Sequence, residues 1–125
     1  MFTPAKMRLH PLSRFTPTPP VLEARVELTD QFGDIGKGVG TIVFNLFAYD
    51  ALSFDHKGKR LGQWPASLTT PQENRDHWDA ITRTYLFKLP LEGNAPDSRT
   101  SLLLIATLTI PNGEQLTDDI TLPPK

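Results

Sequence analysis

The feature that most limits the fold of this chain is a two-residue alternation of apolar and polar side chains. Over residues 21–29 the apolar members are Leu22, Ala24, Val26 and Leu28. The same period recurs over 42–48 and 102–110. Successive side chains of a strand point to opposite faces, so this period predicts half-buried strands whose apolar stripes meet in one interior.

Turn signals separate these stretches. Residues 30–38 hold three glycines and two aspartates, which predicts a reversal of the chain. The two final strands, 101–110 and 114–122, are separated by Pro-Asn-Gly. Asn-Gly between alternating stretches is a strong hairpin signal, so we expect a terminal antiparallel hairpin.

One helix is expected, near residues 71–82. Thr70 is the expected N-cap, Pro71 takes the first helical position, and Glu73 completes a capping box. On this helix Trp78 and Ile81 are expected to dock onto the sheets.

Together these elements predict an all-β fold, an antiparallel two-sheet sandwich of about seven strands, immunoglobulin-like or similar. A length of 125 residues suits a single domain over 1–125 with one core. The thirteen basic and fourteen acidic residues give a net charge of −1, so no chain-wide field attracts nucleic acid or anionic membranes. The longest apolar stretch has about half the ~20 residues of a membrane helix, and no transmembrane segment is expected.

We expect no enzyme and assign no catalytic residue. The chain has no cysteine, and its serines lack the G-x-S-x-G pattern of a nucleophile elbow. Its three histidines, at 10, 56 and 77, are not at metal-binding intervals. No cofactor is expected.

Asp30 and Asp34 are the candidate ligands for calcium, because adjacent loops with carboxylate oxygens suit a hard cation. Aspartate is also an ordinary turn residue, so a purely structural role is the alternative. Four aromatic residues are either a platform for sugars or peptides or parts of the core: Phe47, Tyr49, Trp64 and Trp78. The basic segment 56–60 is interpreted as a solvated loop.

The segment "ARVELTDQFGDIGKGVGTIVFNL" resembles the opening strand-turn-strand unit of bacterial immunoglobulin-like domains. With "LHPLSRF", "TPQENRDHWDAITRTYLFKLPL" and "LTDDITL", the chain is similar to uncharacterised envelope lipoproteins of planctomycete-type bacteria. The resemblance implies a lipid-modified cysteine just before this segment and a place at the cell envelope or in the periplasm. Without a trimmed signal peptide, the cytoplasm is the expected location.

The function expected from the sequence is a non-catalytic binding or structural module for a protein or an envelope polymer, presented by loops such as 30–38. The alternative is a calcium-dependent lipid- or protein-binding sandwich domain, to which Asp30 and Asp34 give a more distant similarity. Oligomeric state is not predicted.

Overall fold

A computed structural model describes residues 3–17, 20–92, 96 and 99–123. Its strands are β1 (Lys6–Leu9), β2 (Arg14–Pro17), β3 (Pro20–Thr29), β4 (Thr41–Tyr49), β5 (Lys57–Ser67), β6 (Trp78–Asp79), β7 (Thr84–Pro90), β8 (Leu102–Thr109) and β9 (Gln115–Leu122). Sheet A has the order β1-β3-β7-β6, with β2 also paired to β3, and sheet B has the order β5-β4-β8-β9.

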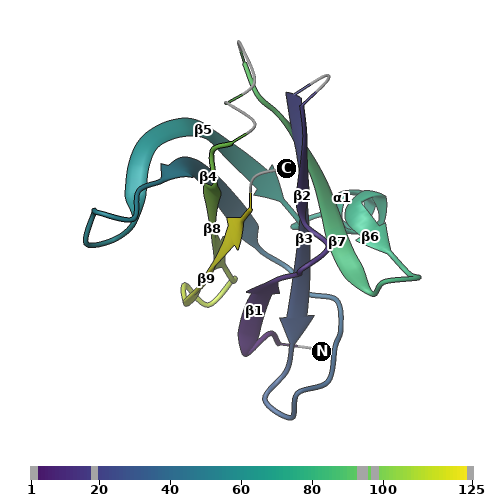
Figure 1. The fold of residues 1–125 in the computed structure, drawn as a ribbon. Helices are drawn as coiled ribbons and strands as arrows, with labels where there is room; N and C mark the ends of the chain where they lie inside the picture. The colour runs from purple at the N-terminus through teal and green to yellow at the C-terminus, as the bar shows by residue number, and fades with distance from the viewer. Residues whose placement is uncertain (1–2, 18–19, 93–95, 97–98, 124–125) are drawn as a thin grey trace.

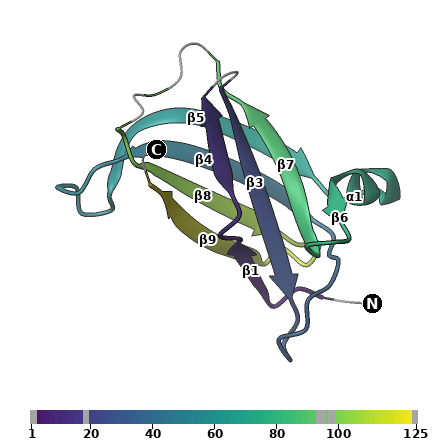
Figure 2. The ribbon, with the colours of Figure 1, turned by 45° about the vertical axis from the view of Figure 1, so that its right-hand side comes forward.

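The two antiparallel sheets lie face to face, with the single short helix beside β6 (Figure 1, Figure 2). The predicted all-β two-sheet sandwich is therefore confirmed. The described residues form nine strands where about seven were predicted. Three of the nine are short: β1 and β2 have four residues each, and β6, which follows the helix, has two.

The alternating apolar residues build the interior, as predicted. The stripes over 22–28, 42–46 and 102–110 are buried, whereas Ala48 at the end of β4 is partly exposed. Phe44 of sheet B and Phe87 of sheet A meet across this interior, with 5.1 Å between their ring centroids. The sandwich is held together mainly by burial of these apolar side chains.

The helix, α1 (Pro71–His77), begins as predicted but ends earlier. The Thr70 hydroxyl accepts a hydrogen bond from the Glu73 N–H, and the Glu73 carboxylate accepts one from the Thr70 N–H. Trp78 is already extended (φ −79°, ψ 128°) and begins β6. The predicted end near residue 82 is wrong, because pairing of β6 with β7 replaces further helical turns.

Because the helix ends at His77, its two predicted docking residues, Trp78 and Ile81, lie outside it. Trp78 packs against the core, with its ring 5.0 Å from that of Tyr85. Ile81 instead lies in the turn between β6 and β7 and is 94% exposed, so its predicted docking is wrong.

The terminal hairpin of β8 and β9 is confirmed. Its turn is closed by a hydrogen bond from the Ile110 N–H to the Glu114 carbonyl oxygen (3.0 Å) and one from the Gly113 N–H to the Ile110 carbonyl oxygen (2.9 Å). Gly113 has a φ of +92°. This backbone conformation favours glycine, because a Cβ atom would crowd the neighbouring backbone. No helix in the described part of the chain is long and apolar enough to cross a membrane.

Asp118 joins the two sheets at one side of the sandwich. Its side chain lies on β9 of sheet B and accepts a hydrogen bond of 2.7 Å from the backbone N–H of Leu9, on β1 of sheet A. The contact satisfies one backbone donor at the edge of sheet A. The first and last described strands are therefore in direct contact.

The β4–β5 hairpin is irregular toward its end. Between Leu46 and Tyr49 the pairing register shifts twice, so β5 has extra residues opposite β4. Such bulges bend a strand and strengthen its twist. Gly58 permits the close approach here, since a Cβ atom at this position would lie 2.7 Å from the carbonyl oxygen of Ala48.

Candidate functional site

The most distinctive surface lies at the end of the β4–β5 hairpin. We call residues 49–60 the hairpin tip; its loop projects beyond the ends of the neighbouring strands, at the left of both ribbon views (Figure 1, Figure 2). Two large apolar side chains of this loop, Leu52 and Phe54, are 98% and 103% exposed. Neighbouring apolar side chains without cover suggest a contact surface for another molecule.

The loop that carries these side chains is held by its own hydrogen bonds. Backbone bonds join Asp50 to His56 (2.9 Å) and Ser53 to Asp50 (3.2 Å). The Asp50 carboxylate accepts from the N–H of Leu52 at 3.0 Å, and the imidazole of His56 stacks on the ring of Tyr49 with 5.0 Å between centroids. The loop is therefore ordered, and Leu52 and Phe54 are exposed by its geometry.

Asp55 is also engaged within the loop. The backbone N–H of Lys57 and the hydroxyl of Ser53 donate to the same carboxylate oxygen, at 3.1 and 2.9 Å. These hydrogen bonds lower the pKa of Asp55, first through Lys57 and then through Ser53. Asp55 therefore stays ionised at neutral pH.

The hairpin tip includes three exposed basic side chains at the start of β5: Lys57, Lys59 and Arg60. Lys57 is opposite Tyr49, and Arg60 is opposite Phe47. Opposed residues of an antiparallel pair share one face of the sheet, so these two cations lie on the outer face beside the two rings. The Lys57 ammonium is 5.5 Å from the centroid of Phe47.

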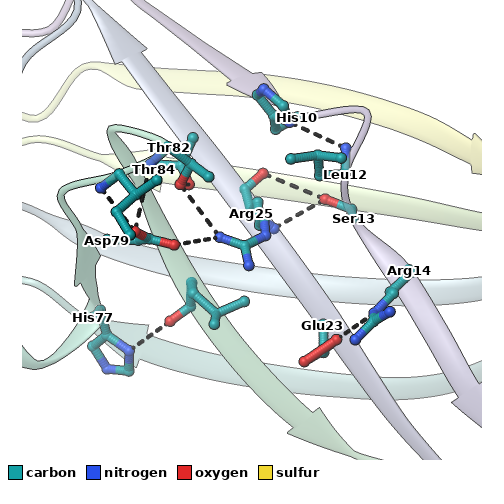
Figure 3. A network of polar contacts seen from close by, with 12 residues as sticks. His10, Leu12, Ser13, Arg14, Glu23, Arg25, His77, Asp79, Thr82 and Thr84 are labelled. Carbon is teal, nitrogen blue, oxygen red and sulfur yellow. Dashed lines mark hydrogen bonds and ion pairs between the residues drawn. The ribbon is translucent and has the colours of Figure 1, made fainter.

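The outer face of sheet A carries a second group of polar side chains, shown in Figure 3. Arg25 lies at its centre and contacts the Asp79 carboxylate at 3.0 Å and the Thr82 hydroxyl at 3.3 Å. The Ser13 hydroxyl accepts a hydrogen bond from the Arg25 backbone N–H at 2.9 Å. These contacts connect β3 with the residue before β2, with β6 and with the β6–β7 turn, and we interpret the group as structural.

His77 borders this face and a cleft of about 750 Å³ beside α1 and β6. Its Nδ1 atom lies 3.0 Å from the carbonyl oxygen of Leu86, and its ring stacks on Phe87 at 4.4 Å. Asp79 is paired with Arg25. His77 and Asp79 therefore each have a structural partner, and the geometry does not join them as an acid–base pair.

The calcium candidates Asp30 and Asp34 lie together in the β3–β4 loop. One oxygen of the Asp30 carboxylate accepts from the backbone N–H of Phe32 (2.9 Å) and of Asp34 (3.0 Å). This is the usual arrangement of an aspartate that stabilises a turn. Among the described residues, no group of three or more acidic, histidine or cysteine side chains could hold a metal ion.

The calcium hypothesis nevertheless stays a prediction with a simple test. A cation that binds only the folded protein raises its melting temperature as the cation concentration rises. A melting temperature that is unchanged by millimolar calcium would remove Asp30 and Asp34 as ligands.

The four candidate platform aromatics do not share one face. Phe47 and Tyr49 lie on the outer face of sheet B, and Trp64 is opposite Phe44 on the inner face, where it packs against the core. Trp78 belongs to sheet A. A single platform of all four is therefore wrong, and only the pair on β4 adjoins the hairpin tip.

Periodicity did not reveal Leu52 and Phe54 as site residues, because they fall in a short polar stretch between strands. The available signal was composition: two large apolar residues within five positions of a turn-rich segment, followed by the basic segment 56–60. Their exposure depends on how the loop folds, which neither alternation nor composition specifies.

No model of a known protein family matches the chain, and a search of characterised proteins finds no significant match.

Proposed function

We propose that this chain is a non-catalytic binding module whose rigid sandwich presents the hairpin tip to another molecule. The observation that carries the proposal is the full exposure of Leu52 and Phe54 on a loop fixed by internal hydrogen bonds. A preordered loop loses little conformational entropy when it binds, which favours affinity.

A place at the bacterial cell envelope is part of this proposal. It rests on the resemblance of residues 24–46 to bacterial immunoglobulin-like domains and of the wider pattern to envelope lipoproteins. The sandwich architecture is compatible with that resemblance, but many unrelated functions use such folds. The site itself is therefore the stronger support.

The test is photo-crosslinking in cells of the native organism. A photoreactive amino acid at position 54 is expected to form a crosslink with the bound molecule, whose chemical class then follows from the mass of the adduct. The matched control places the same group at position 32, since Phe32 is also an exposed aromatic residue (79%) on a loop. Crosslinks from position 32 alone would contradict the proposal and place the interface on the β3–β4 loop.

A further inference from the structure

We infer that the partner of the hairpin tip is an anionic lipid surface, into which Leu52 and Phe54 insert while the neighbouring cations contact phosphate groups. This inference rests on the proposed function, and it adds the chemical class of the partner. Its support comes from the shape, the charge and the aromatic composition of the hairpin tip.

The shape of the tip suits a bilayer better than a protein. A stable protein interface buries about 800 Å² on each partner and needs a complementary surface. The loop of the hairpin tip is instead a narrow projection beyond the neighbouring strands (Figure 2). Its two large apolar side chains, Leu52 and Phe54, are fully exposed. The acyl region of a bilayer accepts such side chains without a preformed pocket.

The tip brings three exposed cations together within residues 57–60. On sheet A, Arg8, Arg14 and Arg25 are each paired with a carboxylate, at 3.2, 2.6 and 3.0 Å. Within the described residues, the three cations of the tip have no carboxylate partner within ion-pair distance. Basic side chains that form no ion pair, beside an apolar tip, are complementary to a layer of anionic headgroups.

The acidic residues of the tip do not cancel this arrangement. Asp50 and Asp55 accept hydrogen bonds from the backbone N–H groups of Leu52 and Lys57, so both carboxylates serve the loop backbone. Lys57, by contrast, extends its ammonium over the ring of Phe47 on the outer face of sheet B. Three cations and two carboxylates leave the tip positively charged although the whole chain is not.

Tyr49 is placed where a membrane-bound tip would meet the headgroups. It is partly exposed at the base of the loop, stacked on His56, and separated from Leu52 by two residues. Tyrosine is enriched at bilayer interfaces, where its ring is in apolar surroundings and its hydroxyl is hydrated.

The experiment is co-sedimentation of the full chain with vesicles of phosphatidylcholine, with and without phosphatidylglycerol. We expect binding to the anionic vesicles that weakens with salt, because screening shortens the reach of the tip cations. The double substitution Leu52→Ser with Phe54→Ser should lower binding at least about tenfold, since two apolar side chains no longer leave water. Phe32→Ser is the control and should bind like the unmodified chain.

The charges are tested separately with Lys59→Glu and Arg60→Glu together. Each cation near an anionic surface contributes about fivefold to binding, so this pair should lower binding well over tenfold and remove most of the salt dependence. Lys6→Glu with Lys88→Glu reverses two exposed lysines of sheet A and should have a much smaller effect. Unchanged melting temperatures would show that all variants are folded.

Three outcomes overturn the inference: no binding of the unmodified chain to anionic vesicles, equal binding by the tip variants, or an equal loss with Phe32→Ser. A protein or glycan adduct from position 54 without vesicle binding would refute the lipid surface and leave the proposed function standing. No adduct from position 54 together with no vesicle binding would refute both.

Discussion

At the scale of single residues, the hydroxyl of Tyr85 shows how a buried polar atom fixes the connections of the fold. It lies 2.7 Å from the Asn74 side-chain oxygen and accepts a hydrogen bond of 3.1 Å from the Gly38 N–H. The Asn74 amide in turn donates to the carbonyl oxygen of Gly38 at 2.6 Å. Burial raises the pKa of Tyr85, so the hydroxyl keeps its proton and remains a donor.

Replacing this hydroxyl tests the network. Tyr85→Phe should lower the free energy of unfolding by about 1–3 kcal/mol, because the buried Gly38 N–H loses its acceptor. Urea denaturation measures the change. Tyr49→Phe, on a partly exposed ring, is the control, and an equal loss there would contradict the network's role.

Acid should weaken the contact between Arg25 and Asp79. The hydrogen bond from Arg25, followed by that from the Ile81 N–H, lowers the pKa of Asp79 in the folded state. A lowered pKa contributes stability above the pKa of the unfolded state, and this contribution is lost as the pH falls through the folded value. We therefore expect the loss below about pH 4.

Thermal melting between about pH 7 and pH 2 tests this dependence. Asp79→Asn should lower the melting temperature at neutral pH, and the two curves should converge in acid. Asp76→Asn, on the exposed side of α1, should follow the unmodified chain throughout. Parallel curves for Asp79→Asn and the unmodified chain would show that this carboxylate does not contribute to acid sensitivity.

At the scale of elements, the start of α1 depends on a local sequence signal. Thr70→Ala removes the side-chain cap and should lower the free energy of unfolding by about 1 kcal/mol, measured by urea denaturation. Thr70→Ser keeps the hydroxyl and should lose much less. Equal effects of both substitutions would mean that the methyl group, not the cap, matters.

The sequence predicted those elements whose signals are local. The capping box at Thr70 and the alternation over 22–28 depend only on neighbouring residues, and both were correct. The end of α1 and the position of Ile81 were wrong, because pairing of β6 with β7 is a tertiary effect that overrides helical propensity. The exposure of Phe54 could not be predicted for a similar reason, since it follows from hydrogen bonds within a folded loop.

At the scale of the whole molecule, the Asp118 side chain on β9 joins the two sheets by accepting the hydrogen bond from the Leu9 N–H on β1. Asp118→Ala should therefore lower the free energy of unfolding by about 1–3 kcal/mol in urea. Its neighbour Asp119 is exposed, so Asp119→Ala is the matched control and should change stability little. Equal losses would contradict a role for the contact between sheets.

The contact between β1 and β9 also has a consequence for synthesis of the chain. The earliest and the latest of the described strands, β1 and β9, are neighbours in space. In a nascent polypeptide, this side of the hydrophobic core therefore stays exposed to water until β9 has left the ribosome. Contacts between such distant parts of a sequence slow folding. During that interval the parts of β8 and β1 that β9 covers are open to other chains. Expression at high concentration should therefore favour aggregation.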